Sequence, residues 1–152
     1  MVLFEFIGLD QYLVGNLSKS LTKPLANILE TSPDDIDFYA PNAQIYHDGV
    51  EQTSWHGLIR VSLPERFHPF EEKVAKVLIH EVKEVMVNIR IEFHYYEEHH
   101  VYEHRNEEYP LFMKDNVKVE VDEEKMLDSE EEDDELYEGN IFKEILGEDY
   151  EK

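Results

Sequence analysis

The 152-residue sequence lacks cysteine and is poor in basic residues. The absence of cysteine excludes disulfides, thiolate nucleophiles and cysteine-ligated zinc sites, and it fits a reducing compartment. Only 14 Lys and Arg residues stand against 36 Asp and Glu, which gives a formal charge of −22. Nucleic acid and anionic membrane surfaces are therefore not expected as partners, because both attract basic proteins.

Long apolar runs and glycine-rich loops are also missing. No apolar run approaches the roughly 20 residues of a membrane-spanning helix. The first segment carries Glu5 and Asp10 where a secretory signal would have basic residues. We therefore expect a cytoplasmic protein. With six glycines and no phosphate-binding loop, nucleophile elbow or zinc-protease motif, no cofactor is expected.

The charge is distributed unevenly along the chain. Residues 1–113 carry 19 acids and 9 bases, whereas residues 114–152 carry 17 acids and 5 bases. This change predicts one folded domain over residues 1–113 and an acidic C-terminal extension over residues 114–152. Within the extension, apolar residues three and four apart predict a short helix over residues 140–147, which either docks on the domain or binds a partner protein.

The domain contains strand-like and helix-like segments in alternation. Alternating segments rich in β-branched and aromatic residues predict strands over residues 2–7, 36–40, 55–63 and 87–93. Apolar residues three or four apart predict one helix from Asp10 to about residue 28 and another over residues 69–85. Pro24 is expected to kink the first helix or to begin a second one. Asp48-Gly49 predicts a tight hairpin turn.

This order predicts an α+β fold with two consecutive β-α-β units. They would form one mixed sheet with both helices on one face. Strand alternation then assigns one set of residues to the helix-facing side: Phe4, Phe6, Ile36, Phe38, Ile59, Val61, Ile89, Ile91 and Phe93. The opposite side is polar but balanced in charge: Glu5, Asp37, Tyr39, Arg60, Ser62, Arg90, Glu92 and His94.

Four histidines near the end of the domain lie among glutamates and tyrosines. They are His94, His99, His100 and His104. Imidazole and carboxylate groups at this density are potential ligands for zinc, nickel or copper. Their spacing matches no closed metal-binding motif, so a solvated loop that chelates weakly is the alternative interpretation.

The order of elements resembles the tautomerase superfamily. The features that carry the resemblance are a strand beginning at the first residue, a turn over residues 31–35 before a strand at Ile36, and residues 55–61 as the central strand of the second unit. The sequence looks like an uncharacterised bacterial branch related in fold to macrophage migration inhibitory factor. The resemblance covers residues 1–113. It implies a homotrimer in which three sheets surround a central channel.

The chemistry that the resemblance implies depends on an N-terminal proline, whose amine moves a proton between carbon and oxygen of an enol. Here position 2 is Val2, and no proline precedes Pro24. If Met1 is removed, Val2 offers a primary α-amine that can act as a weak base or form an imine. Arg60 and Arg90 are the candidates for binding the carboxylate of an oxo-acid, and internal salt bridges are the alternative role for both arginines.

Three functions follow from these patterns. The first is a tautomerase-fold protein without standard proline-based activity, which acts as a small homo-oligomeric binding protein and contacts a protein partner through its acidic extension. The second is an enzyme of the tautomerase superfamily that acts on a small enolisable oxo-acid through the N-terminal amine. The third is a metal-binding module that uses the histidines between residues 94 and 104.

Overall fold

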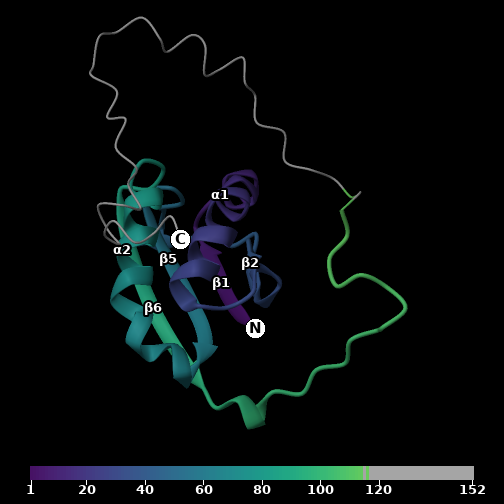
Figure 1. The fold of residues 1–152 in the computed structure, drawn as a ribbon. Coiled ribbons are helices and arrows are strands. Elements are labelled where there is room, and N and C mark those ends of the chain that lie inside the picture. Colours follow the sequence, from purple (N-terminus) through teal and green to yellow (C-terminus); the bar gives the residue numbers. More distant parts are fainter. Residues whose placement is uncertain (115, 117–152) are drawn as a thin grey trace, which may run out of the picture.

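In the computed structural model, which describes residues 1–114 and 116, four strands form one mixed sheet and two helices pack against it (Figure 1). The strands of this sheet are β1 (Val2–Ile7), β2 (Ile36–Tyr39), β5 (His56–Pro64) and β6 (Asn88–Tyr96). The helices are α1 (Gln11–Leu29) and α2 (Glu71–Val82). Short 3-10 helices lie at η1 (Pro33–Asp35), η2 (Glu65–Phe70) and η3 (Glu98–His100).

The sheet has the strand order β2-β1-β5-β6. β1 is parallel to β2, β5 is parallel to β6, and the central pair β1 and β5 is antiparallel. Each parallel pair is joined through a helix, so the chain forms two consecutive β-α-β units. The predicted α+β class, the mixed sheet and the two units are therefore confirmed.

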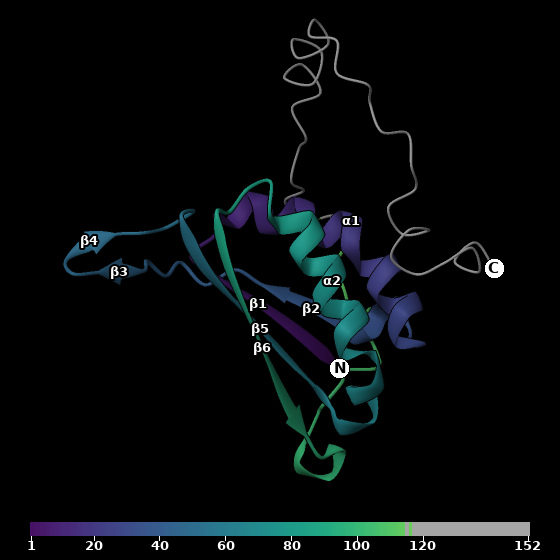
Figure 2. The same cartoon turned by 90° about the vertical axis from the view of Figure 1, so that its left-hand side faces the viewer.

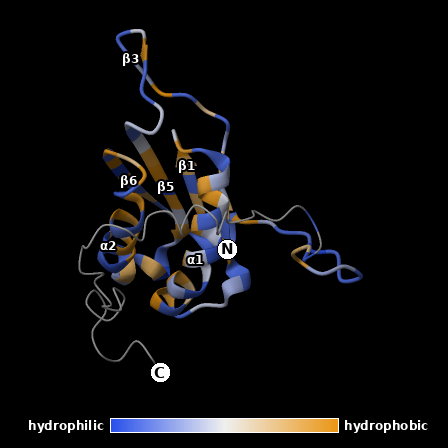
Figure 3. Cartoon of the chain, turned by 90° about the horizontal axis from the view of Figure 1, so that it is seen from above, coloured by the Kyte–Doolittle hydropathy of each residue, from blue (hydrophilic) through white to orange (hydrophobic). Residues whose placement is uncertain are grey.

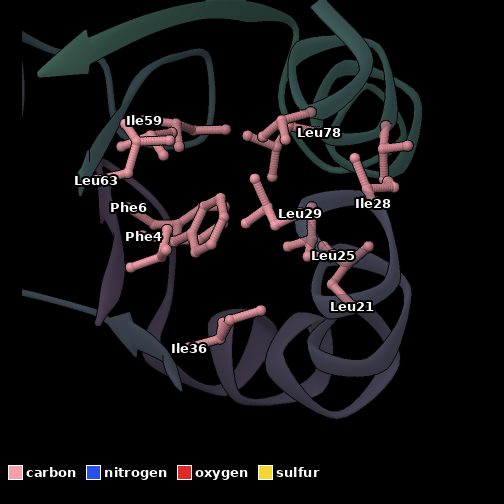
Figure 4. Close-up of a cluster of buried hydrophobic side chains, with 14 of the residues drawn as sticks. Phe4, Phe6, Leu21, Leu25, Ile28, Leu29, Ile36, Ile59, Leu63 and Leu78 are labelled. Atoms are coloured by element: carbon pink, nitrogen blue, oxygen red, sulfur yellow. The ribbon is translucent and has the colours of Figure 1, made fainter. Parts of the chain in front are cut away.

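Both helices cover the same face of the sheet (Figure 2). The side chains between the layers include Phe4 and Phe6 of β1, Leu25 and Leu29 of α1, and Leu78 of α2, all essentially inaccessible to solvent (Figure 4). The two central strands are coloured as largely hydrophobic in Figure 3. The predicted helix-facing residues on β1 and β5 are buried.

Helix α1 has a defined start and end. The Asp10 side chain caps it by accepting a hydrogen bond of 2.8 Å from the backbone N–H of Tyr12. It ends at Glu30, whose left-handed backbone (φ 53°) is the conformation that closes many helices. Pro24 lies inside α1 and does not divide it, so α1 is a single helix.

A small hairpin is formed by β3 (Tyr46–His47) and β4 (Val50–Glu51), and it projects from one end of the sheet (Figure 2). Its turn contains Asp48 and Gly49, both with positive φ (48° and 75°). These are the angles that a tight hairpin turn requires, so the turn predicted from Asp48-Gly49 is confirmed.

Two elements differ from the sequence-based prediction by two or three residues at a boundary. Helix α2 begins at Glu71 and ends at Val82, because the residues before it form η2. Strand β6 continues to Tyr96, since its parallel pairing with β5 extends to Leu63 opposite Tyr95 and Pro64 opposite Tyr96. That pairing is a tertiary effect that local alternation does not show.

None of the helices within residues 1–114 and 116 has the length and apolar character that a membrane-spanning helix needs. The predicted acidic extension, including the short helix over residues 140–147, lies almost entirely outside the described residues. Both remain predictions.

Candidate functional site

The face of the sheet opposite the helices carries a row of charged side chains across three strands. Glu5 on β1 lies opposite Arg60 on β5, and Arg60 lies opposite Glu92 on β6. The Arg60 guanidinium is 3.7 Å from a Glu5 carboxylate oxygen and 3.9 Å from one of Glu92. We call Glu5, Arg60 and Glu92 the charged row. No helix in the described chain covers this open face (Figure 2).

Glu92 also pairs with two residues of its own strand, β6. Arg90 Nε is 2.7 Å from one Glu92 oxygen, and His94 Nε2 is 3.5 Å from the other. The hydrogen bond from Arg90 lowers the pKa of Glu92, and His94 and the charge of Arg60 act in the same direction. Arg60 and Arg90, the two predicted substrate-binding arginines, are thus both paired with carboxylates of the same chain.

A second polar site lies where β1 begins. Met1, Pro64 and Tyr96 line a pocket of about 190 Å³ together with Glu98, Val101 and Glu103. The Tyr96 hydroxyl donates a hydrogen bond to the Met1 carbonyl, which ties the start of β1 to the end of β6. We call this the N-terminal pocket.

Two ionisable groups near the N-terminal pocket have shifted pKa values. Burial raises the pKa of Asp37, the positively charged N-terminus opposes that rise, and Glu103 adds to it. Burial also raises the pKa of Tyr96, while Arg66 opposes the rise and Glu103 adds to it. The N-terminus is therefore close enough to Asp37 to interact with it electrostatically, and Glu103 is close enough to affect both Asp37 and Tyr96.

The structure brings Arg60 and Arg90 together at Glu92 but separates both from Val2. Val2 is fully buried in the core. Arg60 lies four residues before Pro64 on β5, which is about 13 Å along a strand. Arg90 lies opposite Leu58, two residues farther along β5 from the pocket than Arg60. The structure therefore does not bring either arginine to the N-terminus.

The sequence analysis did not single out Tyr96, Glu103 or Arg66 for a site. Tyr96 lies at the end of a strand parallel to β5, and β5 is antiparallel to β1, so it returns to the level of residue 1. Extending the predicted last strand to residue 96 would have revealed this neighbour. Glu103 follows the last strand, and its place beside Met1 has no local sequence signal.

The four predicted metal-binding histidines fall into different places. His94 lies on β6 beside Glu92, and His104 is exposed beyond η3. His99 and His100 belong to η3, with ring centroids 4.0 Å apart. The potential ligand atoms of Glu97, His99 and His100 all lie within 4.8 Å of one another. Among the described residues, the structure thus groups two of the four histidines with a carboxylate.

No protein-family model matches the chain, and no curated protein matches it in sequence. Solved structures do match its fold. A domain of unknown function (DUF1904) from Sebaldella termitidis superposes with a TM-score of 0.62 at 22% identity, over 68% of this chain and 95% of that one. A protein of unknown function from Vibrio cholerae superposes with a TM-score of 0.57 at 16% identity, over 66% and 82%.

A macrophage migration inhibitory factor-like protein from Entamoeba histolytica superposes with a TM-score of 0.52 at 11% identity, over 68% of this chain and 94% of that one. At these identities the likeness concerns the fold. The chain has a tautomerase-type fold like that of macrophage migration inhibitory factor, as its order of elements predicts.

Proposed function

We propose that this tautomerase-fold chain is a small cytoplasmic binding protein that assembles from copies of itself through its open sheet face and lacks standard proline-based tautomerase activity. The homotrimer is the assembly that the resemblance to the tautomerase superfamily implies. The observation that carries the proposal is the charged row, in which the acids Glu5 and Glu92 flank Arg60 on an uncovered face.

A row with both signs of charge is complementary to a copy of itself. A second copy can place a carboxylate against Arg60 and an arginine against Glu5 or Glu92, without burying a net charge. Leu3 and Leu58 are half-buried on the same face, so association also removes apolar surface from water. Within one chain these exposed ion pairs contribute little stability, which leaves specific association as their better-supported role.

The N-terminal pocket supports the non-catalytic part of the proposal. A proline amine is not available there, because position 2 is valine and the first proline is Pro24. Glu98 and Glu103 line the pocket, and Asp37 lies near it. Both lining carboxylates are exposed and paired with arginines, Glu98 with Arg66 and Glu103 with Arg105, so their repulsion of an anionic oxo-acid is weak. The valine at position 2 therefore carries this part of the proposal.

The acidic extension supports a partner of opposite charge. Residues 114–152 carry 17 acids and 5 bases, which attracts a basic protein surface and accelerates encounter with it. In this proposal the folded domain sets the number of copies and the extensions recruit the partner.

Native mass spectrometry of the untagged full chain tests the assembly. The parent is expected to be a trimer, and Arg60→Glu is expected to be mainly monomeric at the same concentration, because it makes the charged row entirely acidic. Lys76→Glu is the matched control: Lys76 pairs with Glu72 at 2.6 Å on α2, away from the open face. A monomeric parent at all concentrations, or equal dissociation of both variants, would contradict the proposal.

A second candidate is an enzyme that acts on a small enolisable oxo-acid through the N-terminal amine. The placement of the N-terminus in a pocket beside Tyr96 favours it. Proton exchange on an enolpyruvate substrate, measured before and after acetylation of the α-amine, distinguishes the two. Activity lost on acetylation would support the enzyme, while activity surviving both acetylation and Arg60→Ala would exclude this mechanism. Absence of activity supports the binding protein.

A further inference from the structure

The turn that follows β6 carries the most closely grouped set of metal-ligand atoms found among the described residues. Glu97, His99 and His100 place one carboxylate oxygen and two imidazole nitrogens within 4.8 Å of one another. Two imidazoles and one carboxylate form a donor set that binds first-row transition metal ions, leaving further positions for water. We infer that Glu97, His99 and His100 form a site for a divalent transition metal ion such as Zn²⁺.

The local backbone explains why these three side chains converge. The N–H of His100 bonds to the Glu97 carbonyl at 3.0 Å, and the N–H of Val101 bonds to that of Glu98 at 3.1 Å. These bonds close one turn of 3-10 helix, in which residues three apart lie on the same side. Glu97 and His100 therefore lie on the same side of the turn, and the His99 ring lies beside the His100 ring at an interplanar angle of 39°.

The turn is also held to the domain. Glu98 forms an ion pair with Arg66 of η2, so the ligands stand on a turn with a tertiary anchor. His99 Nδ1 already lies 3.2 Å from a Glu97 oxygen. Ligand atoms around a tetrahedral zinc ion are roughly 3.4 Å apart, since each bond is about 2.1 Å long. The His100 ring and the other two ligands therefore need to move only slightly closer together to coordinate an ion.

The site differs from the four-histidine cluster predicted from the sequence. His94 belongs to the open face, where it is 3.5 Å from Glu92. His104 is exposed and is not a member of the group. These two histidines provide matched controls, because they lie close in sequence to the site without contributing ligands to it.

Isothermal titration of the untagged full chain with Zn²⁺, in excess Mg²⁺ to occupy simple carboxylate sites, tests the inference. One Zn²⁺ is expected per chain at micromolar concentration, with the stoichiometry checked by native mass spectrometry. His99→Ala, His100→Ala and Glu97→Gln are each expected to weaken binding by about tenfold or more. His94→Ala and His104→Ala are expected to change it by less than about twofold.

Circular dichroism of each variant should match the parent, because all five residues are exposed and outside the core. Absence of zinc binding at micromolar concentration would overturn the inference. Equal weakening by the control variants, or parental affinity in the three ligand variants, would do the same. The inference is independent of the proposed assembly, since its readout is metal affinity in either a monomer or an oligomer.

Discussion

At the scale of single residues, Asp37 gives a prediction whose sign follows from its surroundings. Burial raises the pKa of Asp37 above its usual value of 3.8, so the folded chain holds this proton more tightly than the unfolded chain. The stability linked to Asp37 is therefore present below pH 3.8 and is lost as the pH rises through the raised pKa. Asp37→Asn is expected to be more stable than the parent at pH 7, with a difference that vanishes near pH 3.8.

Thermal unfolding of both proteins, followed by circular dichroism between pH 4 and pH 7, measures this difference. Glu107→Gln is the control, because it removes a carboxylate from an exposed position and should keep the parental profile. If Asp37→Asn is instead less stable than the parent at pH 7, and this deficit shrinks as the pH falls, the charged form of Asp37 is the favoured one.

Sequence reasoning identified the open-face residues correctly but not the N-terminal pocket. Strand alternation is a local rule, so it assigned Arg60 and Glu92 to one face without tertiary information. The pocket combines Met1, Tyr96 and Glu103, which are brought together by strand order and by the path of the chain after β6. Neither of these can be read from local periodicity.

At the scale of elements, Pro24 weakens a helix that the fold nevertheless retains. Proline has no N–H to donate within α1, and a proline in a helix interior costs about 3 kcal/mol relative to alanine. Part of that cost is offset, since proline also restricts the unfolded chain by up to about 1 kcal/mol. Pro24→Ala is therefore expected to raise the free energy of unfolding by about 2–3 kcal/mol in chemical denaturation.

Pro33 supplies the matched comparison for Pro24. It is the first residue of η1, where a fixed φ is favourable and no N–H is required. Pro33→Ala is expected to lower the free energy of unfolding by about 0.5–1 kcal/mol, opposite in sign to Pro24→Ala. If Pro24→Ala is also destabilising, the proline ring is needed for packing in α1.

Helix α1 also shows why a proline in the sequence does not always end a helix. The repeat of leucines along α1 gives it an apolar face, and Leu21, Leu25 and Leu29 are buried against the sheet and α2. Burial of several such side chains outweighs one proline. The sequence therefore predicted the existence and face of the helix correctly. Of the two alternatives at Pro24, a second helix is wrong because packing keeps α1 continuous, and a kink stays a prediction.

At the scale of the whole molecule, net charge and the proposed interface act against each other. Each chain carries −22, of which residues 114–152 contribute 17 acids against 5 bases, so copies that associate repel one another. Salt screens this long-range repulsion more effectively than it weakens a few close pairs, because the Debye length is about 30 Å at 0.01 M and about 10 Å at 0.1 M. Raising NaCl from 10 to 200 mM is therefore expected to strengthen self-association, measured by sedimentation. A chain ending at residue 113 should show a weaker dependence on salt, because its 19 acids and 9 bases leave less repulsion than the full chain has. Association that weakens with salt in both chains would show that ion pairs dominate instead.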